Sequence, residues 1–357
     1  MKKKRIAIAV PDITFVGGAE KVSINLAKML SLNNEVTVIS LFEWENESSF
    51  ISKDSKIKNI TLGYKKTTSI FERLLLNLKS HKQIQNLFDG FDYVIGSNFF
   101  RYYIYPFETK AKLCEIQHLR FEEEGGRDSL LRRLMYKGLY KVIVLTCRDA
   151  EKFKLSNYHN IEVIPNFINE LNTHVNYRAG SDKILAVGRL TYQKNYEDML
   201  DVMAAVVKNN QVVTLHILGD GGEKDHLESR IIELGLVGRV ILHGSVDNVD
   251  KHLTEACALI STSRFEGFPL SFLEALNYEL PIVTYDFESG ARELVQNDVN
   301  GIVIKMGDKI QFADKLSDLL NSPEKKLKYS NGARMVKDKY SPGEIIKEWN
   351  LKVFKDD

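Results

Sequence analysis

The chain has few cysteines and almost no charge excess, and both absences exclude certain kinds of protein. Its 357 residues include only Cys114, Cys147 and Cys257, without a CxxC pairing. This spacing supports neither a disulfide framework nor a zinc site, and it suits a reducing cytoplasm. The formal net charge is +1 at pH 7, and 27% of the residues are charged, as in ordinary globular proteins. We expect no nucleic-acid partner.

Long apolar runs and the common nucleotide fingerprints are also absent. No run approaches the roughly 18 apolar residues that a membrane span needs. The opening MKKKRIAIAV resembles a signal peptide, but Pro11 and Asp12 end its apolar part, so we interpret it as a first strand behind a basic tail. We therefore expect a cytoplasmic protein, either soluble or peripheral on the inner face of the cell membrane.

Two further absences concern chemistry. There is no GxGxxG motif, which disfavours a nicotinamide oxidoreductase. There is also no DxD triplet and no cluster of histidines and carboxylates with the spacing of metal ligands. We expect neither a metal nor another cofactor.

Short β-branched apolar runs alternate with amphipathic stretches along the whole chain, which is typical of βαβ units and parallel sheets. The expected strands are residues 5–10, 36–41, 93–96, 112–116, 141–145, 161–164, 184–187, 213–218, 240–242, 258–260 and 281–284. The polar segment 169–181 lacks periodicity, as a linker would. We predict two doubly wound, Rossmann-like α/β domains, residues 1–166 and 167–341, with ligands bound in the cleft between them.

A basic amphipathic helix is expected from Tyr64 to Lys82. Its apolar positions at helical spacing are Phe71, Leu74, Leu75 and Leu78. Lysine and arginine side chains surround this stripe, so the helix could lie on an anionic membrane surface. It could equally pack its apolar face on the core, and the sequence leaves both interpretations open.

Two glycine-containing junctions follow expected strands. Gly17 and Gly18 precede a helix whose first N–H groups could meet an anion. Arg189 and Lys194 follow the first strand of the second domain, at the end where open α/β sheets bind ligands. Breaking a sugar–phosphate bond places negative charge on the departing diphosphate, which fixed cations would stabilise in place of a metal. An exposed loop with ordinary surface charges is the alternative.

The strongest signal is the segment SRFEGFPLSFLE at residues 263–274. Glu266 and Glu274 stand eight positions apart, across a loop and the first turns of a helix. That spacing would let one carboxylate reach a sugar and the other a ribose of one bound donor. The turn that Gly267, Phe268 and Pro269 form would leave backbone N–H groups free beside a diphosphate.

These motifs resemble those of the family 4 retaining glycosyltransferases, which have the GT-B fold. Glu266 and Glu274 match the EX7E motif. The other matching segments are GGAE at residues 17–20, GRLTYQKN at 188–195, LGDG at 218–221, DFESGAREL at 286–294 and NG at 300–301. The version is similar to that of bacterial capsule, O-antigen and exopolysaccharide enzymes. It implies a crossover helix at residues 342–357 that returns to the first domain.

The resemblance also implies roles for single residues. The catalytic group would comprise Glu266, His118, Arg189 and Lys194. Glu266 would hydrogen-bond the hydroxyls of the transferred sugar, Glu274 those of the ribose, and His118 would lie near the 6-position of the sugar. The remaining donor-binding positions would be Gly17, Gly18, Gly219, Gly244, Ser245, Val246, Gly267, Phe268, Pro269 and Leu270. No residue is expected to bind a metal.

The function expected from these motifs is the metal-independent transfer, with retention, of a hexose or N-acetylhexosamine. The donor would be a nucleotide-diphosphate sugar, expected to be a UDP-sugar. The acceptor would be a glycan or a polyprenyl-diphosphate-linked saccharide in surface polysaccharide biosynthesis. A sugar-nucleotide epimerase or hydrolase on the same fold, or a non-catalytic module that binds nucleotide sugars, is the alternative.

Overall fold

The computed structural model describes residues 3–13, 17–42, 56–65, 70–97, 99, 108–118, 136, 138–169, 175 and 177–355, and only the backbone of residues 70–77. These residues form two compact units, each built on one parallel sheet. Unit 1 comprises Met1–Asn166 and Ile345–Asp357, and unit 2 comprises Phe167–Glu344.

The sheet of unit 1 has seven parallel strands in the order β3-β2-β1-β4-β5-β6-β7. They are β1 (Arg5–Val10), β2 (Glu35–Phe42), β3 (Lys58–Tyr64), β4 (Tyr93–Ser97), β5 (Lys112–Gln117), β6 (Lys141–Val144) and β7 (Ile161–Val163). The strand order reverses between β1 and β4, which makes the sheet doubly wound. All residues of β1 after Arg5 are buried, as expected for a parallel strand that helices cover on both faces.

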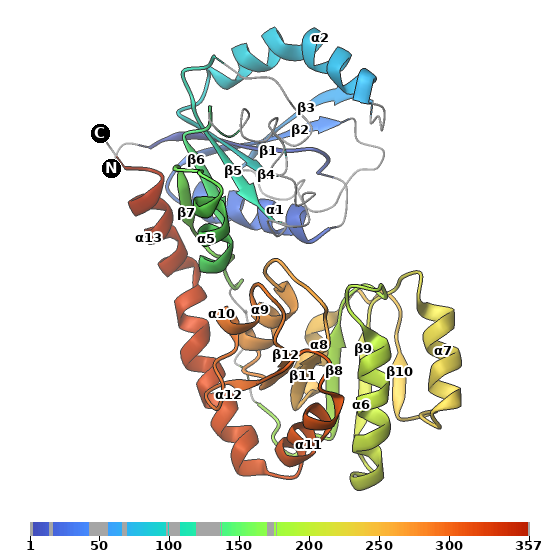
Figure 1. The fold of residues 1–357 in the computed structure, drawn as a ribbon. Helices are drawn as coiled ribbons and strands as arrows, with labels where there is room; N and C mark the ends of the chain where they lie inside the picture. The colour runs from blue at the N-terminus through green and yellow to red at the C-terminus, as the bar shows by residue number, and fades with distance from the viewer. Residues whose placement is uncertain are drawn as a thin grey trace. The chain divides into compact units, whose positions relative to one another are not determined.

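Helices cover both faces of this sheet (Figure 1). Those of unit 1 among the described residues are α1 (Gly18–Ser31), α2 (Ile70–Phe88), α5 (Cys147–Leu155) and the end of α13 (Pro342–Lys352). Phe88 of α2 and Phe153 of α5 share one apolar core with Ala7 and Ala9. The alternate β1 side chains face the other way, where α1 packs on β1, β2 and β4.

The C-terminal segment is fixed to unit 1 by two contacts. Lys352 Nζ donates a hydrogen bond to the carbonyl of Val163 at 2.7 Å. The Phe354 ring meets the Tyr93 ring edge-on, with centroids 5.0 Å apart. The end of α13 therefore belongs to the packing of unit 1, although the preceding helices belong to unit 2.

The sheet of unit 2 has six parallel strands in the order β10-β9-β8-β11-β12-β13. They are β8 (Lys183–Val187), β9 (Thr214–Leu218), β10 (Val240–Leu242), β11 (Ala258–Ser261), β12 (Ile282–Tyr285) and β13 (Gly301–Ile304). Its helices among the described residues are α6 (Tyr196–Asn209), α7 (Lys224–Glu233), α8 (Val249–Glu255), α9 (Leu270–Asn277), α10 (Ala291–Leu294), α11 (Lys309–Leu320), α12 (Pro323–Lys337) and the 3-10 turn η1 (Asp338–Tyr340).

Alternate side chains of β9 point to opposite faces of the sheet of unit 2, and different helices cover these two faces. Leu215 and Ile217 of β9 join the core that α6, α7 and α11 cover. His216 lies between them in the sequence, so it points to the opposite face, where α8 packs on β8. This alternation determines which side chains of β9 can meet α8.

The prediction of two doubly wound α/β units is confirmed, and each expected strand is present with its ends within one residue of the prediction. β3 and β13 were missed. The helix expected from Tyr64 to Lys82 is wrong at its start, because Tyr64 ends β3 and α2 begins at Ile70. Ile60, Leu62 and Tyr64 alternate with polar residues, which is the period of a strand.

The apolar stripe expected on this helix lies mostly outside the described side chains. That applies to Phe71, Leu74 and Leu75, whereas Leu78 is exposed. The described part of α2 packs through Ile84 and Phe88, which are both fully buried. Both interpretations of the stripe stay predictions.

Candidate functional site

The loop between β11 and α9 holds the first carboxylate of the EX7E motif in a largely buried position. Lys194 Nζ donates a hydrogen bond to Glu266 Oε1 at 2.6 Å, and Ser263 Oγ donates to the same oxygen at 2.7 Å. Gln193 Nε2 donates to Glu266 Oε2 at 3.2 Å. The side chain of Glu266 is 10% exposed and that of Lys194 is 19% exposed. A carboxylate so far removed from water needs these charge-assisted partners, which also fix its orientation.

Lys194 reaches Glu266 because the loop after β8 folds back over a glycine. A Cβ on Gly188 would lie 2.6 Å from Lys194 Cε, so a larger residue would displace the lysine stem. The hydroxyl of Tyr196 donates to the Gly188 carbonyl at 2.9 Å, and the Arg264 N–H donates to the Gln193 carbonyl at 2.8 Å. These contacts join the loops that follow β8 and β11.

The loop after β9 packs equally closely on the loop after β8. Gly219 has φ +143°, and a Cβ there would lie 2.0 Å from the Gly188 carbonyl oxygen. Only glycine fits such an approach. The N–H of Gly219 donates to the carbonyl of Gly244 at 2.8 Å, which connects the turn formed by Gly244, Ser245 and Val246 to this site. Three strand-end loops and this turn are thus held together inside unit 2.

Arg189 differs from Lys194 in its surroundings. Arg189 is exposed, and its guanidinium forms no ion pair within the part of the chain that the structure describes. Lys194, by contrast, is held by Glu266. The guanidinium therefore has its planar set of donors available for an external anion.

The second carboxylate of the motif lies on α9. Glu274 is in the second turn of this helix and is partly buried. Phe268 and Pro269 are buried just before the helix begins. A Cβ on Gly290, whose φ is +87°, would lie 2.9 Å from Pro269 Cδ, so Gly290 allows the turn at the start of α9 to pack closely.

Unit 1 brings its own candidate residues to the carboxyl ends of its strands. Gly17 is the N-cap of α1, and Gly18 is the first residue of that helix. Ser97 at the end of β4 is 2.8 Å from His118 Nε2, and Ser23 of α1 is 2.7 Å from Ser97. Burial lowers the pKa of His118 to about 4. His118 is therefore neutral at pH 7, and a chain of hydroxyls contacts its ring.

The comparison with protein families decides the class of the chain. Residues 170–336 match the family described as glycosyl transferases group 1. The chain is a glycosyltransferase. The matched range covers the loops that hold Glu266 and Lys194 and the helix α9 that carries Glu274. The prediction of a glycosyltransferase of the family 4 type with the GT-B fold is confirmed.

Relatives and solved structures extend over nearly the whole glycosyltransferase. The amylovoran biosynthesis glycosyltransferase AmsD of Erwinia amylovora is 28% identical and spans 97% of this chain and 98% of its own. An α-1,4-N-acetyl-D-galactosaminyltransferase of Campylobacter jejuni, named for a saccharide on PP-undecaprenol, is 25% identical and spans 93% and 94%. A variant of S. aureus TarM, solved with UDP and α-GlcNAc-glycerol, superimposes with TM-score 0.80 at 16% identity over 98% and 99%.

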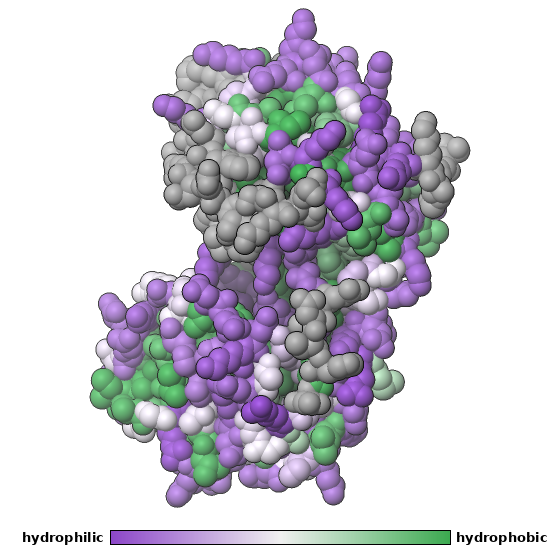
Figure 2. Space-filling view, turned by 180° about the vertical axis from the view of Figure 1, so that it is seen from behind, coloured by the Kyte–Doolittle hydropathy of each residue, from purple (hydrophilic) through white to green (hydrophobic). Residues whose placement is uncertain are grey.

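Among the described residues, no helix combines the length and the apolar character needed to cross a membrane. The face drawn in Figure 2 is mostly polar, with its apolar side chains in several separate areas.

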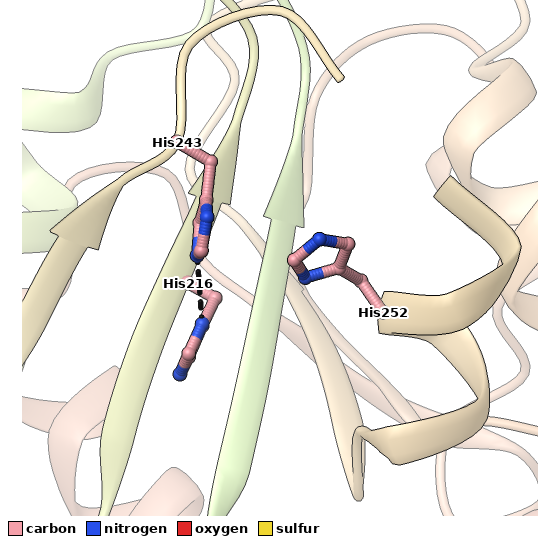
Figure 3. Close-up of side chains that lie close together, drawn as sticks. All are labelled: His216, His243 and His252. Carbon is pink, nitrogen blue, oxygen red and sulfur yellow. Dashed lines mark hydrogen bonds between the residues drawn. The ribbon is translucent and has the colours of Figure 1, made fainter. Parts of the chain in front are cut away.

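Sequence reasoning missed several residues that shape the site. Ser263 and Gln193 stand next to predicted site residues but carry no charge, so only the fold reveals that they hold Glu266. Three histidines, His216, His243 and His252, also come together in unit 2, although their spacing in the sequence gave no signal (Figure 3).

Proposed function

We propose that this transferase moves a hexose or N-acetylhexosamine from a UDP-sugar, with retention and without a metal, to a glycan or lipid-linked saccharide in surface polysaccharide biosynthesis. The observation that carries the proposal is the buried Glu266 beside Lys194, at the carboxyl ends of β8 and β11. This is where open α/β sheets bind nucleotides. The UDP bound to the TarM variant supports the choice of nucleotide.

The cations of unit 2 would bind the diphosphate of the donor. An ammonium group has three N–H donors, and Glu266 accepts one from Lys194. Lys194 can therefore stay paired with Glu266 and still donate to a phosphate oxygen. Arg189 would add a planar fork of donors. Together these charges stabilise the diphosphate as it leaves, which is the work a divalent cation does in other transferases.

Glu266 would hydrogen-bond the hydroxyls of the transferred sugar, and Glu274 those of the ribose. The backbone from Phe268 to Leu270 would contact sugar and phosphate, with Gly267 permitting the turn. The base would rest against the turn of Gly244, Ser245 and Val246, beside Gly219. Since the turn is hydrogen-bonded to the loop after β9, base and phosphate positions would be coupled through the backbone.

Unit 1 would contribute the remaining contacts. Gly17 and Gly18 would approach the donor phosphate at the start of α1. His118 would contact the sugar near its 6-position. A neutral imidazole can donate from one nitrogen and accept at the other, so Ser97 would determine which nitrogen is left for the substrate.

The transfer step would occur on one face of the sugar. The bond from the anomeric carbon to the phosphate oxygen breaks, and a bond to the acceptor oxygen forms on the same side. The acceptor proton passes to the departing phosphate oxygen. Glu266 is poorly suited as a covalent nucleophile, because both of its oxygens already accept hydrogen bonds.

The acceptor proposal follows from the relatives. The Erwinia enzyme is named for amylovoran biosynthesis, and the Campylobacter enzyme for a saccharide on PP-undecaprenol. A lipid-linked acceptor would bring the protein to a membrane surface, where the basic residues of α2, among them the exposed Lys79 and Lys82, would contact anionic lipid. Failure to bind anionic liposomes at low salt would count against this contact.

Calorimetry tests the donor site first. UDP, GDP, ADP and NADH are titrated in EDTA into the full chain, its Lys194→Ala variant and the Lys208→Ala control, which changes an exposed lysine of α6. We expect UDP to bind, with affinity about tenfold or more weaker in Lys194→Ala, because a charge-assisted hydrogen bond is lost. Lys208→Ala should bind like the unchanged protein. Binding of NADH alone, or of no nucleotide, would overturn the donor assignment.

Product analysis tests the reaction. UDP-sugars are screened in EDTA with undecaprenyl-diphosphate-linked saccharides, and the anomeric configuration of the product is determined by NMR. Retention of configuration without added metal is the expected result. Conversion of the donor without an acceptor would instead identify an epimerase or hydrolase.

A further inference from the structure

A cluster of three histidines lies in unit 2 and shares no residue with the proposed donor site. His216 comes from β9, His243 follows β10, and His252 belongs to α8. One ring nitrogen from each lies within 4.8 Å of the others. Figure 3 shows His252 reaching from α8 toward the His216 and His243 rings, which a hydrogen bond links.

The geometry is close to that of three imidazole ligands on one ion. His216 Nδ1 and His243 Nε2 are 2.8 Å apart. Two nitrogens at 2.0–2.1 Å from a tetrahedral zinc ion are separated by about 3.3 Å. An opening of roughly half an ångström would therefore exchange this hydrogen bond for two bonds to a metal. The partly exposed rings leave a path for an ion to enter.

The surroundings orient the rings for such a role. Thr214 Oγ1 is 3.2 Å from His216 Nε2, so a proton on that nitrogen directs the Nδ1 lone pair toward His243. Burial, with the charge of Lys183, lowers the pKa of all three histidines, that of His216 to about 4. Neutral imidazole is the form that binds metals.

We infer that His216, His243 and His252 form a binding site for a divalent transition metal ion of the zinc type. Three histidines with a fourth position for water are a recurrent ligand set for zinc. Imidazole nitrogens select zinc, copper or nickel over magnesium and calcium, which prefer oxygen ligands. The metal would have no part in the sugar transfer, which we propose to be metal-independent.

His243 connects the histidine cluster to the turn that begins at Gly244. His243 directly precedes Gly244, whose carbonyl accepts the hydrogen bond from Gly219. Gly244 also begins the turn proposed to receive the base. An ion that ties β9, the end of β10 and α8 together would restrict this turn, so metal binding is expected to raise the Tm of the protein.

Lys183 opposes the ion and therefore offers a sharp test. Its Nζ lies 3.3 Å from His252 Nδ1 and 2.9 Å from Glu255 Oε2. Its positive charge beside the ligands repels a cation, and the carboxylate of Glu255 offsets that charge in part. Lys251, on the same helix as His252, adds a second, more distant positive charge. Removal of the Lys183 charge should therefore tighten metal binding. If the three histidines only packed together and bound no ion, this substitution would have no effect on metal binding.

The experiment measures metal binding by calorimetry at pH 7.5, on full-length protein without a histidine tag. The background is Cys147→Ser, because the exposed thiol could also bind zinc. We expect one Zn²⁺ per chain, Co²⁺ binding with a tetrahedral visible spectrum, and no Mg²⁺ binding. His243→Gln and His252→Gln should each lower the affinity for Zn²⁺ by at least about tenfold, since even indirect partners of metal ligands are worth that much.

Two further variants make the result decisive. Lys183→Met should tighten Zn²⁺ binding by about tenfold or more, because a unit charge a few ångströms from a divalent ion is removed. His226→Gln, on a half-exposed histidine of α7, should leave it unchanged. No saturable Zn²⁺ binding, or equal binding by His243→Gln and the unchanged protein, would overturn the inference. Sugar transfer is assayed in EDTA, so either outcome leaves that proposal unaffected.

Discussion

The two units have the same type of sheet but hold their candidate residues by different chemistry. In unit 2 a buried carboxylate is neutralised by a lysine from a neighbouring loop, and glycines let these loops approach closely. In unit 1 the candidate side chain is a neutral histidine in contact with the hydroxyl of Ser97, which in turn accepts a hydrogen bond from Ser23. Fixed charge suits a diphosphate, whereas a neutral hydrogen-bonding group suits sugar hydroxyls. The same topology would therefore support the two kinds of recognition that we propose.

The largest effect expected in this comparison is on catalysis in unit 2. Glu266→Gln keeps the shape of the side chain but removes the negative charge that we propose to face the transferred sugar. The expected loss in kcat is about 100- to 1,000-fold, the usual effect of removing one preorganised electrostatic contact. The affinity for UDP, which lacks the transferred sugar, should change little. Initial rates measure kcat and calorimetry measures the affinity for UDP, and Glu197→Gln, at an exposed position of α6, is the control.

The Lys194–Glu266 pair should also determine part of the stability of unit 2. Lys194→Met leaves a carboxylate that is 10% exposed without its cation. Loss of one partner of a buried pair costs about 3 kcal/mol. The double variant Lys194→Met with Glu266→Gln should be less destabilised than Lys194→Met alone, as judged by urea unfolding. Equal stability of these two variants would mean that the ion pair contributes nothing to the free energy of unfolding.

The close approach of the loops gives a prediction of intermediate size. Gly219→Ala places a Cβ 2.0 Å from the Gly188 carbonyl oxygen at φ +143°. Backbone strain of this kind costs about 1–3 kcal/mol. Gly222→Ala, where a Cβ would meet nothing within 4 Å, is the matched control. A Tm equal to that of the control would contradict the packing described for these loops.

The smallest expected effect concerns unit 1 and its dependence on pH. Burial lowers the pKa of His118 from 6.5 to about 4. Between these two pH values the imidazole stays neutral in the folded protein but takes up a proton in the unfolded chain. Stability should therefore fall as the pH drops from about 6.5 toward 4. His118→Gln should flatten this part of the stability profile, whereas the control His159→Gln, at an exposed site of unit 1, should not. Chemical unfolding at several pH values measures the slope.

Much of the fold could be predicted because strands in doubly wound sheets are short apolar runs. The central strands β1 and β11 are apolar along almost their whole length. β3 was missed because it lies at the edge of the sheet and is only half apolar, so its period resembled the start of the basic helix. β13 has four residues and begins with glycine, a weak strand former.

The candidate site was predictable only where charge and spacing carry a signal. Glu266 and Glu274 stand out in an apolar context, as do Arg189 and Lys194 after a strand. The partners Ser263 and Gln193 are ordinary polar residues, so the sequence gives no reason to choose them. The three histidines lie 27 and 9 positions apart, which matches no motif, and only the strand order places them together.

The sequence by itself determined the two parallel sheets, the class of enzyme and the charged residues proposed to bind the donor. These properties depend on local periodicity and on motifs within short segments. Only the tertiary structure decided that Lys194 pairs with Glu266, that Gly219 must be a glycine, and that His216 meets His243 and His252. Each of these contacts joins loops or strands distant in the sequence. Their proximity depends on the order and register of the strands, which no short segment encodes.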